Sequence, residues 1–178
     1  MADDLNAPAW SHPVKLTDVS RAPVRLTLAA DETERVAIAR QLKLPEVERL
    51  EARVTVTPWL DGLQVDADWR GRASQTCGVT LEPFAGDFSG RFQVRAVPPD
   101  SDAAPVEGSE DEIDLSTPDP PDLLVNDTID VAALVVEHLG LELDAYPRAP
   151  GVVFEPPEED ETASPFAVLA GLKPTGGA

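Results

Sequence analysis

Side chains that commonly carry out catalysis or bind metals are scarce in this chain of 178 residues. It has one cysteine, Cys77, and two histidines, His12 and His138. A single cysteine excludes an internal disulfide, and with two distant histidines it lacks the ligand spacing of a zinc site. Nothing near Cys77 in the sequence would activate its thiol, and His138 is expected on an apolar helix stripe. Phosphate loops and EF-hand spacing are also missing, so we expect no enzyme activity, no metal and no cofactor.

Long apolar runs are absent too. No segment approaches the 18 or so apolar residues of a membrane span, and the start, MADDLNAPAW, has neither the basic nor the apolar region of a signal peptide. These absences predict a soluble, cytoplasmic protein with no membrane partner. No small-molecule substrate is indicated either.

Basic residues are nearly missing from the second half. Residues 1–95 hold 12 Lys or Arg and 14 Asp or Glu, a net charge of −2, whereas residues 96–178 hold 2 and 19, a net charge of −17. From Ala96 to Pro147 there is no Lys or Arg. Such a charge repels phosphate backbones and attracts basic partners. The alternative is that the acidic residues only keep flexible segments solvated.

The clearest structural signal is a pair of alternating segments. Apolar and polar residues alternate over residues 50–57 and 63–73, which is typical of strands with one buried side. Asp61–Gly62 between them predicts a two-residue hairpin turn. A third strand is predicted over residues 84–97, with its phenylalanines on the apolar side. The stretch QTCGVTLEPF, residues 75–84, then reads as the turn between the second and third strands, with Cys77 small and partly buried.

Two helices are predicted. Asp31 and Glu34 resemble a capping box and Pro45 prevents continuation, so the first helix spans about 32–42. The second starts at Asp130 or Thr128 and ends near Gly140. Its apolar stripe comprises Val131, Leu134, Val135, His138 and Leu139. Shorter extended segments are predicted at 14–19, 24–28, 113–115 and 122–125.

These elements predict one α+β domain over residues 14–150. Its antiparallel β-sheet has about five or six strands, and two main helices pack against one face. Residues 98–111 predict a flexible acidic loop, and 151–178 an acidic, Pro/Gly-rich tail. Within the tail, SPFAVLAGLK (164–173) is an apolar segment that docks either on its own domain or on a partner. Its docking residues are Phe166, Leu169 and Leu172.

Four arginines fall on the polar side of the predicted sheet. They are Arg70, Arg72, Arg91 and Arg95. One interpretation is that they are ordinary solvated strand positions paired with nearby aspartates. The other is that they form a modest basic patch that binds phosphate or an acidic partner. In the second case Trp69 or Trp59 is available for stacking on a base.

Two blocks of the sequence resemble the YceD-type family of bacterial large ribosomal RNA subunit accumulation proteins, in an alphaproteobacterial-like variant. One is WRGRASQTCGVTLEPF (69–84), and the other is IDVAALVVEHLGLELDAYPRAPG (129–151) with SPFAVLAGLK beyond it. The family-motif residues here are Cys77, Glu137, His138, Tyr146, Pro147 and Arg148. Many relatives carry a C-x-x-C pair in the first block and a second pair near the C-terminus, which would suit zinc. Here Thr80 replaces the second cysteine, so that site is lost.

The resemblance implies a factor in large-subunit biogenesis that supports accumulation of 23S ribosomal RNA without enzyme activity. The charge distribution suggests that its acidic half binds a basic ribosomal protein or assembly factor. The alternative is direct contact with ribosomal RNA through the basic sheet face, which the net charge of −19 disfavours.

Overall fold

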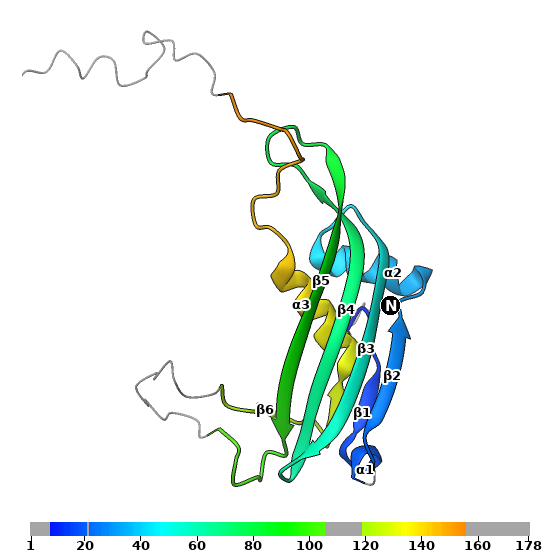
Figure 1. Cartoon of the computed structure of the whole chain (residues 1–178), viewed down its shortest axis with the longest axis vertical. Coiled ribbons are helices and arrows are strands. Elements are labelled where there is room, and N and C mark those ends of the chain that lie inside the picture. Colours follow the sequence, from blue (N-terminus) through cyan, green and yellow to red (C-terminus); the bar gives the residue numbers. More distant parts are fainter. Residues whose placement is uncertain (1–7, 21, 106–118, 156–178) are drawn as a thin grey trace, which may run out of the picture.

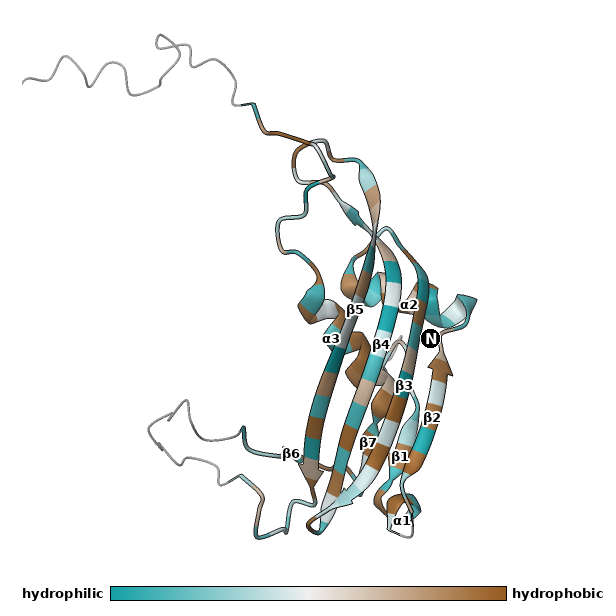
Figure 2. Cartoon of the chain, viewed as in Figure 1, coloured by the Kyte–Doolittle hydropathy of each residue, from teal (hydrophilic) through white to brown (hydrophobic). Residues whose placement is uncertain are grey.

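A long hairpin forms the centre of the fold (Figure 1). The computed structural model describes residues 8–20, 22–105 and 119–155. Strands β3 (Glu46–Trp59) and β4 (Gly62–Thr76) pair antiparallel, and β5 (Pro83–Val97) pairs with β4 on its other side. Apolar and polar residues alternate along β3 and β4 in Figure 2, so these strands and their buried side are confirmed.

Two shorter strands complete this sheet within the described residues. β2 (Val24–Ala29) pairs antiparallel with β3, and β6 (Asp122–Leu123) pairs with β5, giving the order β2-β3-β4-β5-β6. The prediction that residues 122–125 rejoin the sheet is confirmed for Asp122 and Leu123. The pairing of β6 with Ala96 and Val97 is parallel, however. The predicted antiparallel arrangement therefore holds for β2 to β5 and is wrong for β6. The predicted strand at 113–115 lies outside the described residues.

The turn between β3 and β4 lies one residue earlier than predicted. Trp59 pairs with Gly62, so Leu60 and Asp61 form the loop and Gly62 opens β4. Leu60 has a positive φ of 51°. Gly62 is needed for close approach and not for the turn, because a Cβ there would lie 2.0 Å from the carbonyl oxygen of Ala96.

Residues 14–19 were predicted to form one extended segment, but the structure divides them between a strand and a helix. Strand β1 (Pro13–Lys15) pairs with β7 (Thr128–Asp130) in a separate two-stranded sheet, and the chain then turns into the short helix α1 (Leu16–Val19). The backbone N–H of Leu16 donates to Asp127 O at 2.9 Å, and the Val19 side chain is fully buried. Burial of Val19 therefore overrides the strand tendency of this segment.

Both main helices start where their capping residues predict. Helix α2 (Glu32–Leu42) has the full capping box of Asp31 and Glu34, and it ends at Lys43, which adopts a left-handed conformation. Helix α3 (Val131–Glu142) is capped by Asp130, whose carboxylate accepts from the backbone N–H groups of Ala132 and Ala133. Helix α3 continues two residues past Gly140.

The core lies between the sheet and the helices. α2 and α3 lie on one side of the sheet, behind it in Figure 1, and the apolar side chains of β3 and β4 face them. The core residues include Ile38, Leu50, Val56, Val65, Trp69, Val135 and Leu139. No described helix or strand covers the opposite face of the sheet, which carries the polar side chains of β3 and β4 and which we call the open face. The coarse α+β prediction, with two main helices on one face, is confirmed.

Candidate functional site

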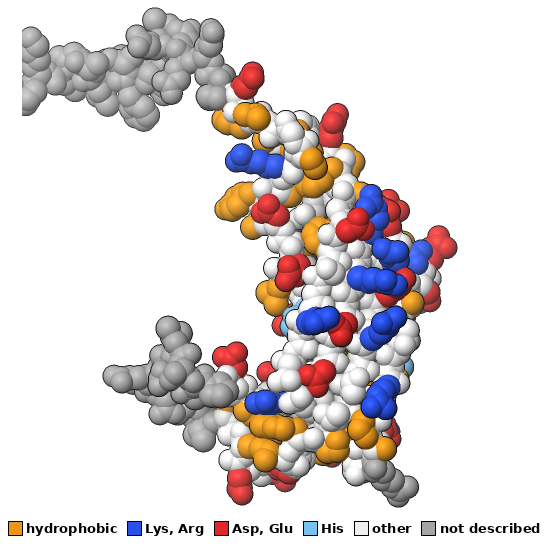
Figure 3. Space-filling view, in the orientation of Figure 1, with side chains coloured by type: hydrophobic (Ala, Val, Ile, Leu, Met, Phe, Trp, Pro, Cys, Tyr) orange, Lys and Arg blue, Asp and Glu red, His pale blue; other side chains and the backbone are white. Residues whose placement is uncertain are grey.

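The open face of the sheet carries a set of arginines, which we call the arginine face. Blue side chains gather on it in Figure 3. The strand register places them in neighbouring rows, for example Arg53–Asp68–Arg91 and Glu51–Arg70–Ser89. The face comprises Arg25, Arg49, Arg53, Arg70, Arg72, Arg91 and Arg95. The same face holds Glu46, Glu48, Glu51, Asp66, Asp68 and Asp87, so seven arginines meet six carboxylates.

Three of the four arginines singled out from the sequence form ion pairs. Arg70 Nη2 lies 2.8 Å from Glu51 Oε2, and this hydrogen bond lowers the pKa of the Glu51 carboxyl. Arg72 bridges Glu48 at 3.1 Å and Asp87 at 2.8 Å, and Arg91 pairs with Asp68. All these pairs are at least partly exposed, so each adds little to stability. Arg72 and Arg91 thus pair with predicted aspartates, whereas Arg70 pairs with a glutamate. That these arginines bind no ligand stays a prediction.

Arg95 behaves differently from the other three. Its guanidinium donates to the amide oxygens of Gln64 and Gln93, at 3.1 and 3.4 Å. Its Cζ also lies 5.1 Å from the centre of the Trp59 ring, a cation–π distance. Arg95 is therefore held on the open face by neutral groups and keeps its charge uncompensated by any described carboxylate.

Three arginines of this face were not singled out from the sequence. Arg25 lies on β2, and Arg49 and Arg53 lie on β3; all three are exposed, and none forms an ion pair with a described residue. Their alternation with apolar neighbours was visible in the sequence. Only the pairing of β2 with β3 and β3 with β4 places them beside the other four. A shallow hollow of about 200 Å³ lies among Arg53, Arg70 and their neighbours.

Trp69 is not part of this face. It is 4% exposed and packs in the core, because it alternates with Arg70 along β4 and so points toward the helices. Trp69 is thus unavailable for stacking on a base, contrary to its place among the candidate contacts. Of the two tryptophans considered for stacking, the partly exposed Trp59 is the one that lies beside an arginine.

Cys77 lies in the loop that joins β4 to β5. It is fully buried, more than predicted, and its backbone N–H donates to Glu82 O at 2.9 Å. Hydrogen bonds to the sulfur lower the thiol pKa to about 6: the backbone N–H of Ala149 contributes most, followed by the hydroxyl of Thr80 and the backbone N–H groups of Thr80 and Val79. The prediction that nothing near Cys77 in the sequence would activate its thiol was wrong, because Thr80 and Val79 are near it and lower the pKa. Ala149, which contributes most, is distant in sequence.

Metal ligands do not gather around Cys77. Its loop contacts the segment after α3, where Gly78 N–H donates to Pro147 O at 2.8 Å. The described residues that donate hydrogen bonds to the sulfur are Val79, Thr80 and Ala149, and none of them is a usual metal ligand. Among the described residues no cluster of three or more His, Cys, Asp or Glu side chains is suited to a metal.

The family-motif residues of the second block fall into two groups. His138 is part of the helix–sheet interface: its ring stacks on Phe92 with centroids 3.8 Å apart, and its Nδ1 lies 2.9 Å from Leu134 O. Glu137, Tyr146 and Arg148 are exposed, and Tyr146 is 83% exposed. The predicted docking residues Phe166, Leu169 and Leu172 lie outside the described residues, so their role stays a prediction.

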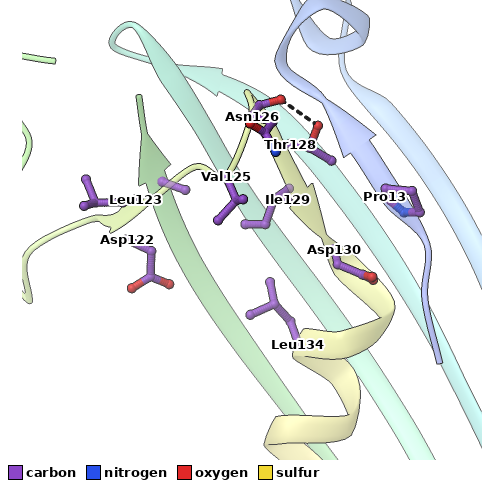
Figure 4. A pocket seen from close by; sticks show the side chains of 10 residues that line it. Pro13, Asp122, Leu123, Val125, Asn126, Thr128, Ile129, Asp130 and Leu134 are labelled. Atoms are coloured by element: carbon purple, nitrogen blue, oxygen red, sulfur yellow. Dashed lines mark hydrogen bonds between the residues drawn. The ribbon is translucent and has the colours of Figure 1, made fainter. Parts of the chain in front are cut away.

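A groove runs between β5, β6 and α3. It consists of two adjoining hollows of about 510 and 420 Å³ that share Asp122. Figure 4 shows the first of these, with Val125, Ile129 and Leu134 around it and Asp122 at its rim. The second is lined by Val94, Asp119 and His138, among others. The first hollow is mainly apolar, whereas most residues of the second, including Gln93, Arg95 and Asp119, are polar. A groove with an apolar part and a charged part suits a peptide with both kinds of side chain.

We compared the chain with models of protein families, with curated proteins and with solved structures. No curated protein and no solved structure matches this chain significantly. Within the described residues no helix is long and apolar enough to cross a membrane. A family model described as large ribosomal RNA subunit accumulation protein YceD matches residues 65–173, which is more than half of the chain. The chain therefore belongs to the YceD family, whose name implies a role in accumulation of the large-subunit ribosomal RNA.

Proposed function

We propose that this protein is a non-enzymatic factor of large ribosomal subunit biogenesis. It supports accumulation of 23S ribosomal RNA in the cytoplasm by binding a basic ribosomal protein or assembly factor through its acidic half. The observation that carries this proposal is the separation of charge. Residues 96–147 contain no Lys or Arg, whereas the arginines of the sheet gather on the open face.

In the fold, the acidic residues 119–142 lie on a different side of the molecule from the arginine face. Residues 119–142 contribute β6, β7 and α3, which lie along the edge of β5 and behind the sheet (Figure 1). Asp119, Asp122 and Glu137 are exposed there. A basic partner is attracted to this side by the uncompensated acids, and the attraction acts mainly on the rate of association and on partner choice.

Affinity purification tests the proposal. The tagged full-length chain should capture a basic ribosomal protein or assembly factor from lysate, and the captured amount should fall as salt rises, since screening weakens the attraction. Loss of the protein should lower the 23S ribosomal RNA level relative to 16S. Capture that does not depend on salt, or capture of no basic protein, contradicts the proposal.

A second function is favoured by one observation: Arg25, Arg49 and Arg53 are exposed and form no ion pair with a described residue. Together with Arg95 they could contact phosphates of ribosomal RNA, while Trp59 stacks on a base. The acids on the same face and the net charge of −19 oppose this binding.

RNA binding can be tested with a 23S fragment over a salt series. Arg25→Ala, Arg49→Ala and Arg53→Ala together should weaken binding and reduce its salt dependence. The matched control replaces the ion-paired Arg70, Arg72 and Arg91 by alanine, which removes the same charge. If the variant with Arg25, Arg49 and Arg53 replaced binds the fragment as tightly as the wild type, the hypothesis of RNA binding is wrong.

A further inference from the structure

The outer edge of β5 is unpaired over most of its length. β5 spans Pro83–Val97, but β6 pairs only with Ala96 and Val97, and no other strand of the described chain pairs with that edge. From Pro83 to Arg95 its outward N–H and C=O groups therefore have no strand partner there. Such an edge is a template for an added strand.

The groove described above lies at the lower end of this edge. Its two hollows follow β5 from Gln93 to Ala96 and follow one face of α3 from Leu134 to His138. The stacking of His138 on Phe92 holds the α3 wall against β5, and the contact of His138 Nδ1 with Leu134 O orients the ring. Because this wall is fixed, the groove exists before any ligand binds, and the ordering cost of binding is reduced.

The surface of the groove is both apolar and acidic. Leu123 and Val125 at its rim are 48% and 71% exposed. Asp119 and Asp122 are exposed and form no ion pair with a described residue. The one arginine that lines it, Arg95, has its guanidinium held on the open face by Gln64 and Trp59. Two carboxylates, Asp119 and Asp122, thus share the second hollow with one arginine, so its lining has a net negative charge.

We infer that this edge and groove bind an extended basic peptide segment of a protein partner by strand addition to β5. The peptide lies in line with β6, and its backbone pairs with β5. Alternate side chains then point the same way, so apolar side chains enter the groove beside Val125 and Leu134 while lysines or arginines reach Asp119 and Asp122. The inference rests on the proposed function and names the binding surface that it requires.

The other edge of the sheet is a poorer site for the same peptide. β2 is only six residues long, follows Pro23 and carries Arg25. A short strand gives an added peptide few backbone partners. Length therefore favours β5. β5 itself carries Arg91 and Arg95, so the negative charge for a basic peptide comes from Asp119 and Asp122 beside its lower end.

A labelled ten-residue peptide of alternating lysine and valine serves as the probe. It should bind the full-length chain, and Asp119→Lys with Asp122→Lys should weaken binding roughly tenfold. Glu32→Lys with Glu46→Lys is the matched control, since both are exposed, lie away from the groove and change the net charge equally. This control should change binding by less than about twofold. Amide hydrogen exchange should slow within 83–95 when the peptide binds.

Several results would overturn the inference. One is equal binding of a glutamate–valine peptide, and another is protection of β2 amides instead of β5 amides. Binding of the lysine peptide only after Phe166→Glu and Leu169→Glu would mean that the chain's own tail segment occupies the groove. A dimer that dissociates in the Asp119→Lys, Asp122→Lys variant would mean that a second copy occupies it.

A lysate experiment separates this inference from the proposed function. If the wild type and the Asp119→Lys, Asp122→Lys variant capture the same basic protein equally, the groove is the wrong surface but the proposed function stands. If the wild type captures no basic protein although the lysine peptide binds at β5, the proposed function is wrong and the groove is real.

Discussion

Gly62 lies directly against the backbone of Ala96, so that a Cβ at position 62 would be 2.0 Å from the Ala96 carbonyl oxygen. The two residues belong to neighbouring strands near the end of the sheet where β6 joins β5. Because of this close approach, only glycine fits without strain at position 62, the first residue of β4. It also explains why the hairpin glycine lies in the strand and not in the loop.

Gly62→Ala should therefore destabilise the protein by about 1–3 kcal/mol, because the backbone must shift to admit the methyl group. Chemical denaturation measures this change. Gly78→Ala is the control, since a Cβ there meets only Pro147 O at 3.7 Å. Equal stability of the two variants would contradict the close approach.

Asp130 links α3 to the N-terminal segment. Its carboxylate accepts from Ala132 and Ala133 N–H at the helix start, from His12 N–H at 2.8 Å and from the Ser11 hydroxyl at 2.6 Å. Asp130→Ala should cost about 1–2 kcal/mol of unfolding free energy. Asp130→Asn keeps a capping oxygen and should retain most of the stability. If asparagine costs as much as alanine, the cap is not the source of the effect.

The ion pair of Arg70 with Glu51 predicts a dependence of stability on pH. Its hydrogen bond lowers the pKa of Glu51 in the folded protein. The carboxylate therefore stabilises the fold above its ordinary pKa, and this contribution is lost as pH falls through the folded value. The stability difference between wild type and Arg70→Ala should be small near neutral pH and should vanish in acid. A difference that grows in acid would contradict this sign.

The thiol of Cys77 should ionise with a midpoint near pH 6, because the Ala149 backbone N–H, the Thr80 hydroxyl and the backbone N–H groups of Thr80 and Val79 favour the thiolate. Ultraviolet absorbance of the thiolate, followed over a pH series, measures the midpoint, and Cys77→Ala supplies the baseline. A midpoint near the ordinary value of a free thiol would refute the arrangement around the sulfur.

Burial should nevertheless keep Cys77 unreactive. The side chain has no exposed surface, so a bulky alkylating reagent should label it slowly in the native protein and quickly after unfolding. Cys77→Ala should leave 23S ribosomal RNA accumulation unchanged. Loss of accumulation in a variant that still folds would give the thiol a function.

The sequence by itself determined the local elements. Alternation with period two specified β3, β4 and β5 and the sides they bury, since side chains of a strand point alternately to its two faces. Asp31, Glu34 and Asp130 specified where α2 and α3 begin, because capping bonds join residues only two or three positions apart. The two blocks also carried the resemblance to the family.

Tertiary structure decided what these elements bring together. Strand register placed Arg25, Arg49 and Arg53 beside the four predicted arginines, and it paired Arg70 with Glu51. The return of the chain after α3 brought Ala149 to Cys77, and β6 left most of the β5 edge open. These relationships join residues far apart in sequence, so no local period or spacing specifies them. They are specified by the pairing of the strands and by the burial of apolar side chains in the core.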